Sequence, residues 1–125
     1  MTGLPVPSRV LAVGAHPDDI EFGAGATLAK WAAAGCLLLH LVCTDGSKGS
    51  WDPDEDTARL VVTRQAEQRA ASRALGGTGD VVFLGWPDGE LASGSAPRAR
   101  NIRQISCEAV TNGRALDQRD QTMPW

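Results

Sequence analysis

The chain has 125 residues, of which 42% are hydrophobic and 22% charged, and its formal net charge is −3. This length and composition predict one globular domain at most, and the small negative charge gives no electrostatic basis for binding nucleic acid or an anionic membrane. The apolar runs are too short to cross a bilayer and the N-terminus lacks a secretory pattern, while three cysteines without a CxxC spacing predict a reducing, cytoplasmic location.

The first half of the chain predicts a strand, a helix and a second strand. Residues 9–14 are an apolar run that ends at a glycine, which is typical of a short buried strand. The glycine-rich segment 23–27 leads into residues 28–34, which are rich in helix formers and are followed by Gly35. Residues 37–44 are the clearest strand, because few polar residues interrupt them, as expected for a sheet covered on both faces.

The second half adds a helix and a third strand. After a loop, a small or apolar residue recurs every four positions from Val62 to Ala74 and predicts a helix over 57–75. Residues 81–84 predict a strand, and a turn follows at 86–90. This alternation indicates an α/β fold, in the form of a Rossmann-like parallel sheet with flanking helices and right-handed crossovers.

The composition changes after residue 91. Residues 92–125 hold six large apolar residues and five arginines, and they give no convincing strand. We therefore predict two parts. Residues 1–91 form the N-terminal part of an α/β domain whose sheet is truncated after the third strand, and residues 92–125 form an atypical tail that is frameshifted or disordered.

A histidine and two carboxylates follow the first predicted strand. Adjacent carboxylates repel, and neither is buried cheaply without a cation or hydrogen-bond donors. A divalent metal removes this conflict, with a nitrogen from His16, an oxygen from Asp19, and Asp18 left beside it as a base. The alternative is a turn in which one aspartate caps the next helix, but that accounts for a single carboxylate.

The other polar positions have simpler interpretations. A dinucleotide site fails on spacing, because Leu28 stands where GxGxxG needs its third glycine, and the two aspartates would repel a pyrophosphate. His40, between two leucines, is interpreted as a core residue. Arg64 and Glu67 have the spacing of a surface ion pair on a helix. Asp88 fits ordinary turn chemistry.

Taken together, these segments resemble the LmbE-like, or PIG-L, family of N-acetyl deacetylases over about residues 9–91. The resemblance is carried by His16-Pro17-Asp18-Asp19 with Glu21, the glycine-rich helix start, the segment 44–49, Arg64 with Glu67, and the segment 84–89. It implies a Rossmann-like fold and zinc-dependent hydrolysis of the N-acetyl group of an amino sugar or a related small molecule.

The resemblance also implies a role for each of five residues. His16 and Asp19 would hold Zn2+, and Asp18 would be the general base that takes a proton from the attacking water. Arg64 and Asp88 would contact the sugar-like part of the substrate. Histidine and carboxylate ligands would also suit Fe2+ or Mn2+.

The chain departs from the family in one respect. Family members take a third zinc ligand, a histidine, from a later segment, whereas this sequence has no histidine after His40. Two alternatives to an active deacetylase therefore stay open, namely a catalytically inactive α/β module that binds a sugar or nucleotide, and a gene fragment. An exposed sheet edge also leaves self-association into a homo-oligomer open.

Overall fold

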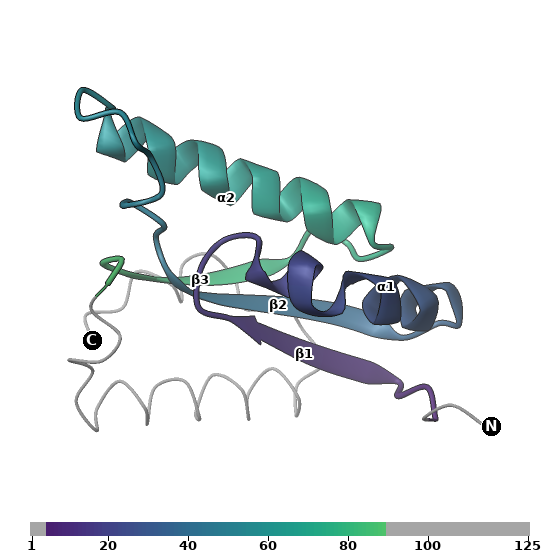
Figure 1. Cartoon of the computed structure of the whole chain (residues 1–125). Helices are drawn as coiled ribbons and strands as arrows, with labels where there is room; N and C mark the ends of the chain where they lie inside the picture. Colours follow the sequence, from purple (N-terminus) through teal and green to yellow (C-terminus); the bar gives the residue numbers. More distant parts are fainter. Residues whose placement is uncertain (1–4, 90–125) are drawn as a thin grey trace, which may run out of the picture.

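The structure, a computed structural model, describes residues 5–89, which form a three-stranded sheet with two helices (Figure 1). In chain order the elements are β1 (Arg9–Gly14), α1 (Asp19–Ala33), β2 (Leu37–Thr44), α2 (Thr57–Ala74) and β3 (Val81–Trp86). The predicted boundary near residue 91 and the predicted tail at 92–125 lie outside the described residues.

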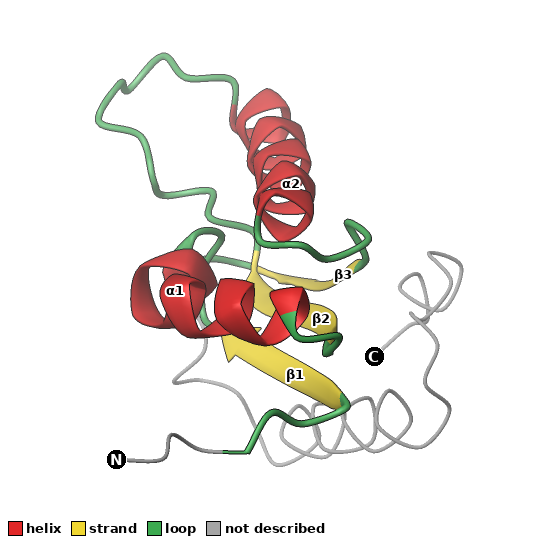
Figure 2. Ribbon diagram, turned by 90° about the vertical axis from the view of Figure 1, so that its right-hand side faces the viewer, coloured by secondary structure: helices red, strands yellow, loops and turns green. Residues whose placement is uncertain are grey.

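The sheet is parallel throughout, in the order β1-β2-β3. At its carboxyl edge Gly14 lies opposite Val42, and Thr44 lies opposite Trp86. Both crossovers step in the same direction across the sheet, so right-handed connections place both helices on the same face. Figure 2 shows α1 and α2 together on one side of the sheet. The predicted α/β fold with a parallel sheet and flanking helices is confirmed.

The sheet buries apolar side chains on both faces, because successive residues of a strand point to opposite sides. The cluster on the helix side contains Ile20, Leu28, Cys36, Leu38, Val42, Val81 and Phe83, and the cluster on the other side contains Leu41, Cys43, Val82, Leu84 and Trp86. The neighbours Leu41 and Val42 thus belong to different clusters, and both are completely buried. This explains why the sequence of β2 reads as a continuous apolar run rather than as an alternation.

Helix α1 begins at Asp19, well before the predicted start at residue 28. The predicted start is wrong because Gly23 and Gly25 lie inside the helix, despite the low helix propensity of glycine. A Cβ atom on Gly25 would lie 3.8 Å from Leu75 Cδ2, which is an ordinary van der Waals contact, so packing against the end of α2 does not require glycine here. The acidic cluster consequently lies in the first turn of a helix, where the helix dipole favours negative charge.

Helix α2 buries polar residues rather than its small-residue stripe. The predicted span was close, since the helix ends at Ala74 and is followed by Gly76 in a left-handed conformation with φ 100°. The stripe of Val62, Ala66, Ala70 and Ala74 is exposed to solvent. The buried residues of α2 are Gln68 and Ser72. The four-residue repeat therefore predicted the helix correctly, but its residues do not form the buried face.

The described part of the chain contains no helix long and apolar enough to cross a membrane. Its two cysteines, Cys36 and Cys43, are buried and carry free thiols.

We expect the central strand to dominate the stability of the fold. Leu41 is fully buried on β2, so Leu41→Ala removes about three buried carbon groups and leaves a cavity, and it should lower the free energy of unfolding by about 3 kcal/mol. Leu37→Ala is the matched control, because Leu37 begins the same strand but is 43% exposed. Urea denaturation of both variants checks this, and equal losses would contradict the assigned core.

Candidate active site

The carboxyl ends of the three strands bring three loops together. Thr44 donates through its backbone N–H and its hydroxyl to the carbonyl of Ala15, at 2.9 and 2.8 Å, which ties the end of β2 to the turn after β1. Asp45 donates its backbone N–H to the carbonyl of Trp86, and its Oδ1 accepts the backbone N–H of Asp88 at 3.2 Å. Bonds of this kind fix the three polar segments against one another at the carboxyl edge of the sheet, where functional groups of parallel sheets gather.

The ring of His16 lies between two carboxylates, one from the first turn of α1 and one from the loop after β3. Its Nε2 lies 2.9 Å from Asp88 Oδ1, and its Nδ1 lies 3.2 Å from Asp19 Oδ2. The other oxygen of Asp88 accepts the backbone N–H of Lys48 at 3.1 Å, so this carboxylate is bound at both ends and is almost buried. The side chains of His16 and Asp19 are about half exposed, which leaves their contact open to a ligand.

Which ring nitrogen of His16 carries a proton decides whether its contact with Asp19 is attractive or repulsive. An ionised carboxylate only accepts hydrogen bonds, so Asp88 requires a proton on His16 Nε2. In the neutral ring Nδ1 then has a lone pair that faces the Asp19 carboxylate oxygen at 3.2 Å, and two lone pairs repel. A cation between the two atoms, either a proton or a metal ion, turns this repulsion into attraction.

The spacing of these two donor atoms fits a metal ion. Two ligands on a tetrahedral zinc ion lie about 3.3 Å apart, from the usual zinc–nitrogen and zinc–oxygen distances. The observed separation between His16 Nδ1 and Asp19 Oδ2 is 3.2 Å. A metal-binding histidine also ordinarily donates its second ring N–H to a carboxylate, which is the position that Asp88 takes here. Within residues 5–89, however, no group of three histidine, cysteine or acidic residues is arranged to hold a metal ion.

Asp18 stands at the N-cap of α1 in a left-handed conformation, with φ 87° and ψ −22°. Among the described residues it is the only one besides glycine with a positive φ. Its side chain makes no capping hydrogen bond, so the interpretation of this aspartate as a simple helix cap is not supported. Strained backbone of this kind concentrates at functional sites.

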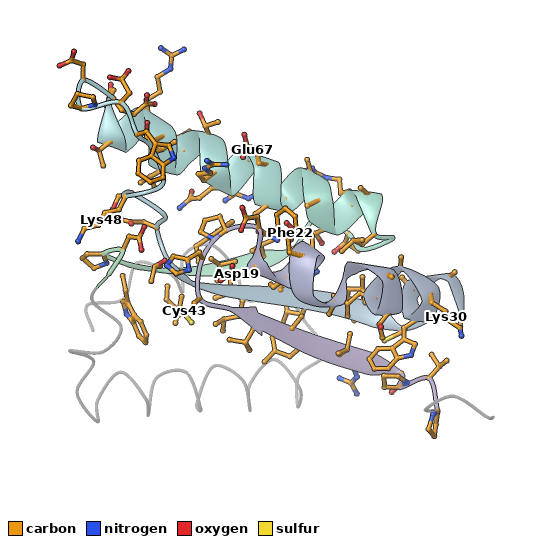
Figure 3. The ribbon with its side chains drawn as sticks, in the orientation of Figure 1. Asp19, Phe22, Lys30, Cys43, Lys48 and Glu67 are labelled. Carbon is orange, nitrogen blue, oxygen red and sulfur yellow. The ribbon has the colours of Figure 1, made fainter. Side chains whose placement is uncertain are left out.

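A pocket of about 280 Å3 opens beside these residues. Its lining consists of His16, Pro17, Asp18, Asp19, Gly46, Gly49 and Arg64. A second pocket of about 220 Å3 lies on the other side of Asp18, towards α2, and is lined by Pro17, Asp18, Glu21, Arg64, Glu67, Gln68 and Ala71. Figure 3 shows where Asp19, Lys48 and Glu67 stand on α1, on the loop after β2 and on α2.

The two predicted substrate contacts are placed differently. Arg64 lines both pockets, and its Nη1 lies 3.1 Å from Glu67 Oε2, so the ion pair expected from the spacing is present at the pocket wall. Asp88 does not line either pocket, and both of its oxygens are engaged by His16 and the Lys48 backbone. Its geometry is that of a residue which orients His16.

Glutamine 68 is the site residue that the sequence did not single out. Its Oε1 accepts the backbone N–H of Asp18 at 2.8 Å, and its Nε2 contacts Glu21 Oε1 and His40 Nδ1. The signal available in the sequence was weak, because one glutamine next to Glu67 on a helix resembles any surface residue. The prediction that His40 belongs to the core is confirmed, since the ring is fully buried and burial lowers its pKa below the ordinary 6.5.

The comparison with known protein families matches residues 11–122 to the family described as PIG-L: GlcNAc-PI de-N-acetylase. This match covers most of the chain. The chain belongs to the PIG-L family. The resemblance drawn from the motifs is thereby confirmed, and the site described above lies within the matched range.

Curated PIG-L relatives include enzymes named for deacetylation of amino sugars. The 1D-myo-inositol 2-acetamido-2-deoxy-alpha-D-glucopyranoside deacetylase of Actinosynnema mirum is 37% identical over 127 residues, which covers 96% of this chain and 44% of the relative. The diacetylchitobiose deacetylase of Thermococcus kodakarensis is 31% identical over 96 residues, or 77% of this chain and 34% of the relative. The chain thus spans less than half the length of these relatives.

Solved structures show the same fold. N,N'-diacetylchitobiose deacetylase from Pyrococcus horikoshii superposes with a TM-score of 0.71 at 28% identity, covering 81% of this chain and 38% of that one. GalB, the 4-carboxy-2-hydroxymuconate hydratase of Pseudomonas putida, gives a TM-score of 0.63 at 21% identity, covering 82% of this chain and 42% of that one. The second likeness shows the fold alone.

The burial of His40 predicts a loss of stability in acid. Its pKa in the folded protein is below 6.5, so as the pH falls through 6.5 the unfolded chain takes up a proton that the folded chain does not. The free energy of unfolding should therefore be lower at about pH 5.5 than at about pH 7.5, by more in the wild type than in His40→Gln. Urea denaturation at both values checks this, and His16 is present in both proteins, so its contribution cancels. An identical pH dependence in the two proteins would contradict the assignment.

Proposed function

We propose that this PIG-L chain carries the metal-binding and base-bearing part of a hydrolase that removes the N-acetyl group from an amino-sugar-like small molecule. The observation that carries the proposal is the arrangement of His16 between Asp19 and Asp88, with Asp18 next to it on the pocket wall. The names of the relatives support the substrate class, since they specify deacetylases of acetamido sugars.

His16 and Asp19 would hold the metal ion, and Asp88 would orient the His16 ring. A divalent ion at such a site acidifies water and polarises a carbonyl group, which is the chemistry that amide hydrolysis needs. Zn2+ suits the nitrogen and oxygen donors best, and Fe2+ or Mn2+ would also accept them. Because two donors alone hold zinc weakly, a third ligand has to come from outside residues 5–89.

Asp18 would act as the general base. Its carboxylate accepts no capping hydrogen bond from the helix, so its oxygen atoms stay available to accept a proton. It also lines the pocket next to both proposed metal-binding residues. It would take a proton from the attacking water and return it to the nitrogen of the leaving amino sugar as the C–N bond breaks. Arg64, on the pocket wall, offers a fork of N–H donors to sugar hydroxyl groups.

A cytoplasmic location and self-association complete the proposal. Two buried free thiols fit a reducing compartment. In the described sheet β1 pairs on one side only, and Val13 on this strand is 51% exposed, which favours pairing or packing with a second copy.

Metal binding by the chain is the first test. Zn2+ should bind one to one and raise the melting temperature, and His16→Ala should abolish the effect because it removes a ligand. Asp88→Asn should weaken the metal affinity by about 10–100-fold, since it removes the carboxylate that orients His16. Isothermal titration with parallel melting curves measures both quantities.

Asp54→Asn is the matched control, because Asp54 is an exposed aspartate on the loop between β2 and α2. Its metal affinity should equal that of the wild type. Wild-type metal affinity in His16→Ala would contradict the proposed ligand set.

Catalysis is tested with the metal-loaded chain and acetamido sugars of the kind named for the relatives, diacetylchitobiose among them. We expect release of acetate, and Asp18→Asn should lower kcat by about 100- to 10,000-fold while leaving metal affinity unchanged, because it removes the base and not a ligand. Substrate binding without turnover, independent of metal and unaffected by Asp18→Ala, would instead identify an inactive binding module.

A further inference from the structure

The backbone of Asp18 is held by a side chain from another helix. Its N–H donates to Gln68 Oε1 at 2.8 Å, across 50 positions of sequence. Because its φ is 87°, the residue is in a region that side-chain-bearing residues adopt only when their surroundings hold them there. The bond from Gln68 is such a constraint, since it stabilises the turn that contains Asp18.

The orientation of the Gln68 amide is fixed by all of its partners. The Asp18 N–H is a donor, so it requires the amide oxygen on its side. The amide nitrogen then faces two acceptors, Glu21 Oε1 and His40 Nδ1, the second at 3.2 Å. A flipped amide would place donor against donor at Asp18 and acceptor against acceptor at Glu21, and Gln68 is only 2% exposed, so water offers no substitute.

The same hydrogen bonds fix which tautomer His40 adopts. Its Nδ1 accepts from Gln68, so in the neutral ring the proton lies on Nε2. Nε2 is buried and has no hydrogen-bond partner among the described residues. Packing alone would favour an aliphatic residue here, as at Leu39 and Leu41 beside it. Burying a histidine and a glutamine here lowers the stability of the fold, so their presence requires an offsetting role in the protein.

We propose that Gln68 is the positioning residue for Asp18, and that His40, as the Nε2–H tautomer, fixes Gln68 in the required orientation. Helix α2 and strand β2 thereby determine where the Asp18 carboxylate points. The catalytic consequence rests on the proposed function, in which Asp18 is the base. The contact itself does not, and it is tested separately below.

The contact is tested by hydrogen exchange on the intact chain. In Gln68→Leu the Asp18 amide should exchange about tenfold faster than in the wild type, because it loses its acceptor, while the amide of Val42 in the central strand should not change. Gln65→Leu is the matched control, since Gln65 lies on the same helix and makes no side-chain hydrogen bond among the described residues. Unchanged exchange at Asp18 in a folded Gln68→Leu protein would overturn the proposal.

The wild-type protein provides a measurement that does not depend on a variant that folds. Nitrogen-15 correlation spectra of the imidazole ring distinguish the two neutral tautomers of His40. We expect the proton on Nε2, and a proton on Nδ1 would overturn the proposed network, because that nitrogen would then face the Gln68 amide as a second donor.

Activity separates a positioning role from a merely structural one. In the metal-loaded chain, Gln68→Leu should lower kcat by about 10–100-fold with KM and metal affinity unchanged, because Asp18 is misaligned while the ligands stay in place. An equal kcat in Gln68→Leu and Gln65→Leu would overturn the positioning role. If the wild type shows no turnover, the proposed activity of this chain fails, whereas the exchange result still decides whether Gln68 holds Asp18.

Discussion

The contact between His16 Nε2 and Asp88 Oδ1, at 2.9 Å, joins residues 72 positions apart, and the rest of the site depends on it. His16 follows β1 and Asp88 follows β3, which are separated in the sheet by β2. The contact therefore requires all three strands to end at one edge, and the loop after β2 to curve between the outer two. Two backbone hydrogen bonds hold the loop after β2 in this position. The N–H of Asp45 donates to the carbonyl of Trp86 in β3, and the N–H of Lys48 donates to the carboxylate of Asp88. Once Asp88 occupies Nε2, Nδ1 is left for Asp19 and a cation.

The sequence predicted the parts of this arrangement that repeat along the chain. Apolar runs predicted the bounds of β1 and β2 to the residue. Because parallel strands end at the same edge of the sheet, the polar segments that follow them meet there. The predicted helix start is wrong because α1 contains two glycines in its first half, despite the low helix propensity of glycine. The contact of Asp88 with His16 also could not be read from the sequence, since a turn residue that faces a substrate and one that faces a histidine have the same local pattern.

The polar face of α2 could not be predicted for a different reason. Periodicity identifies a buried face by its apolar residues, but here the small residues face solvent while Gln68 and Ser72 face the sheet. What places Gln68 inside is a set of partners from two other segments. Asp18 and Glu21 lie at the start of α1 and His40 lies on β2, and none of them is near Gln68 in sequence. A buried polar residue is stabilised by the complete set of its hydrogen bonds, and that set exists only in the folded protein.

The two networks meet at Asp18 and Asp19, which are adjacent in sequence but held by different parts of the fold. Asp19 is tied to His16 and through it to Asp88 and β3, whereas the backbone of Asp18 is tied to Gln68 and through it to α2 and β2. Asp18 lies in a left-handed turn. In the proposed function, this turn would let Asp19 serve as a ligand while Asp18 stays free of the metal. Two like charges side by side would otherwise compete for the same cation. The strained backbone of Asp18 would therefore be what allows the two neighbouring aspartates to take the different chemical roles proposed for them.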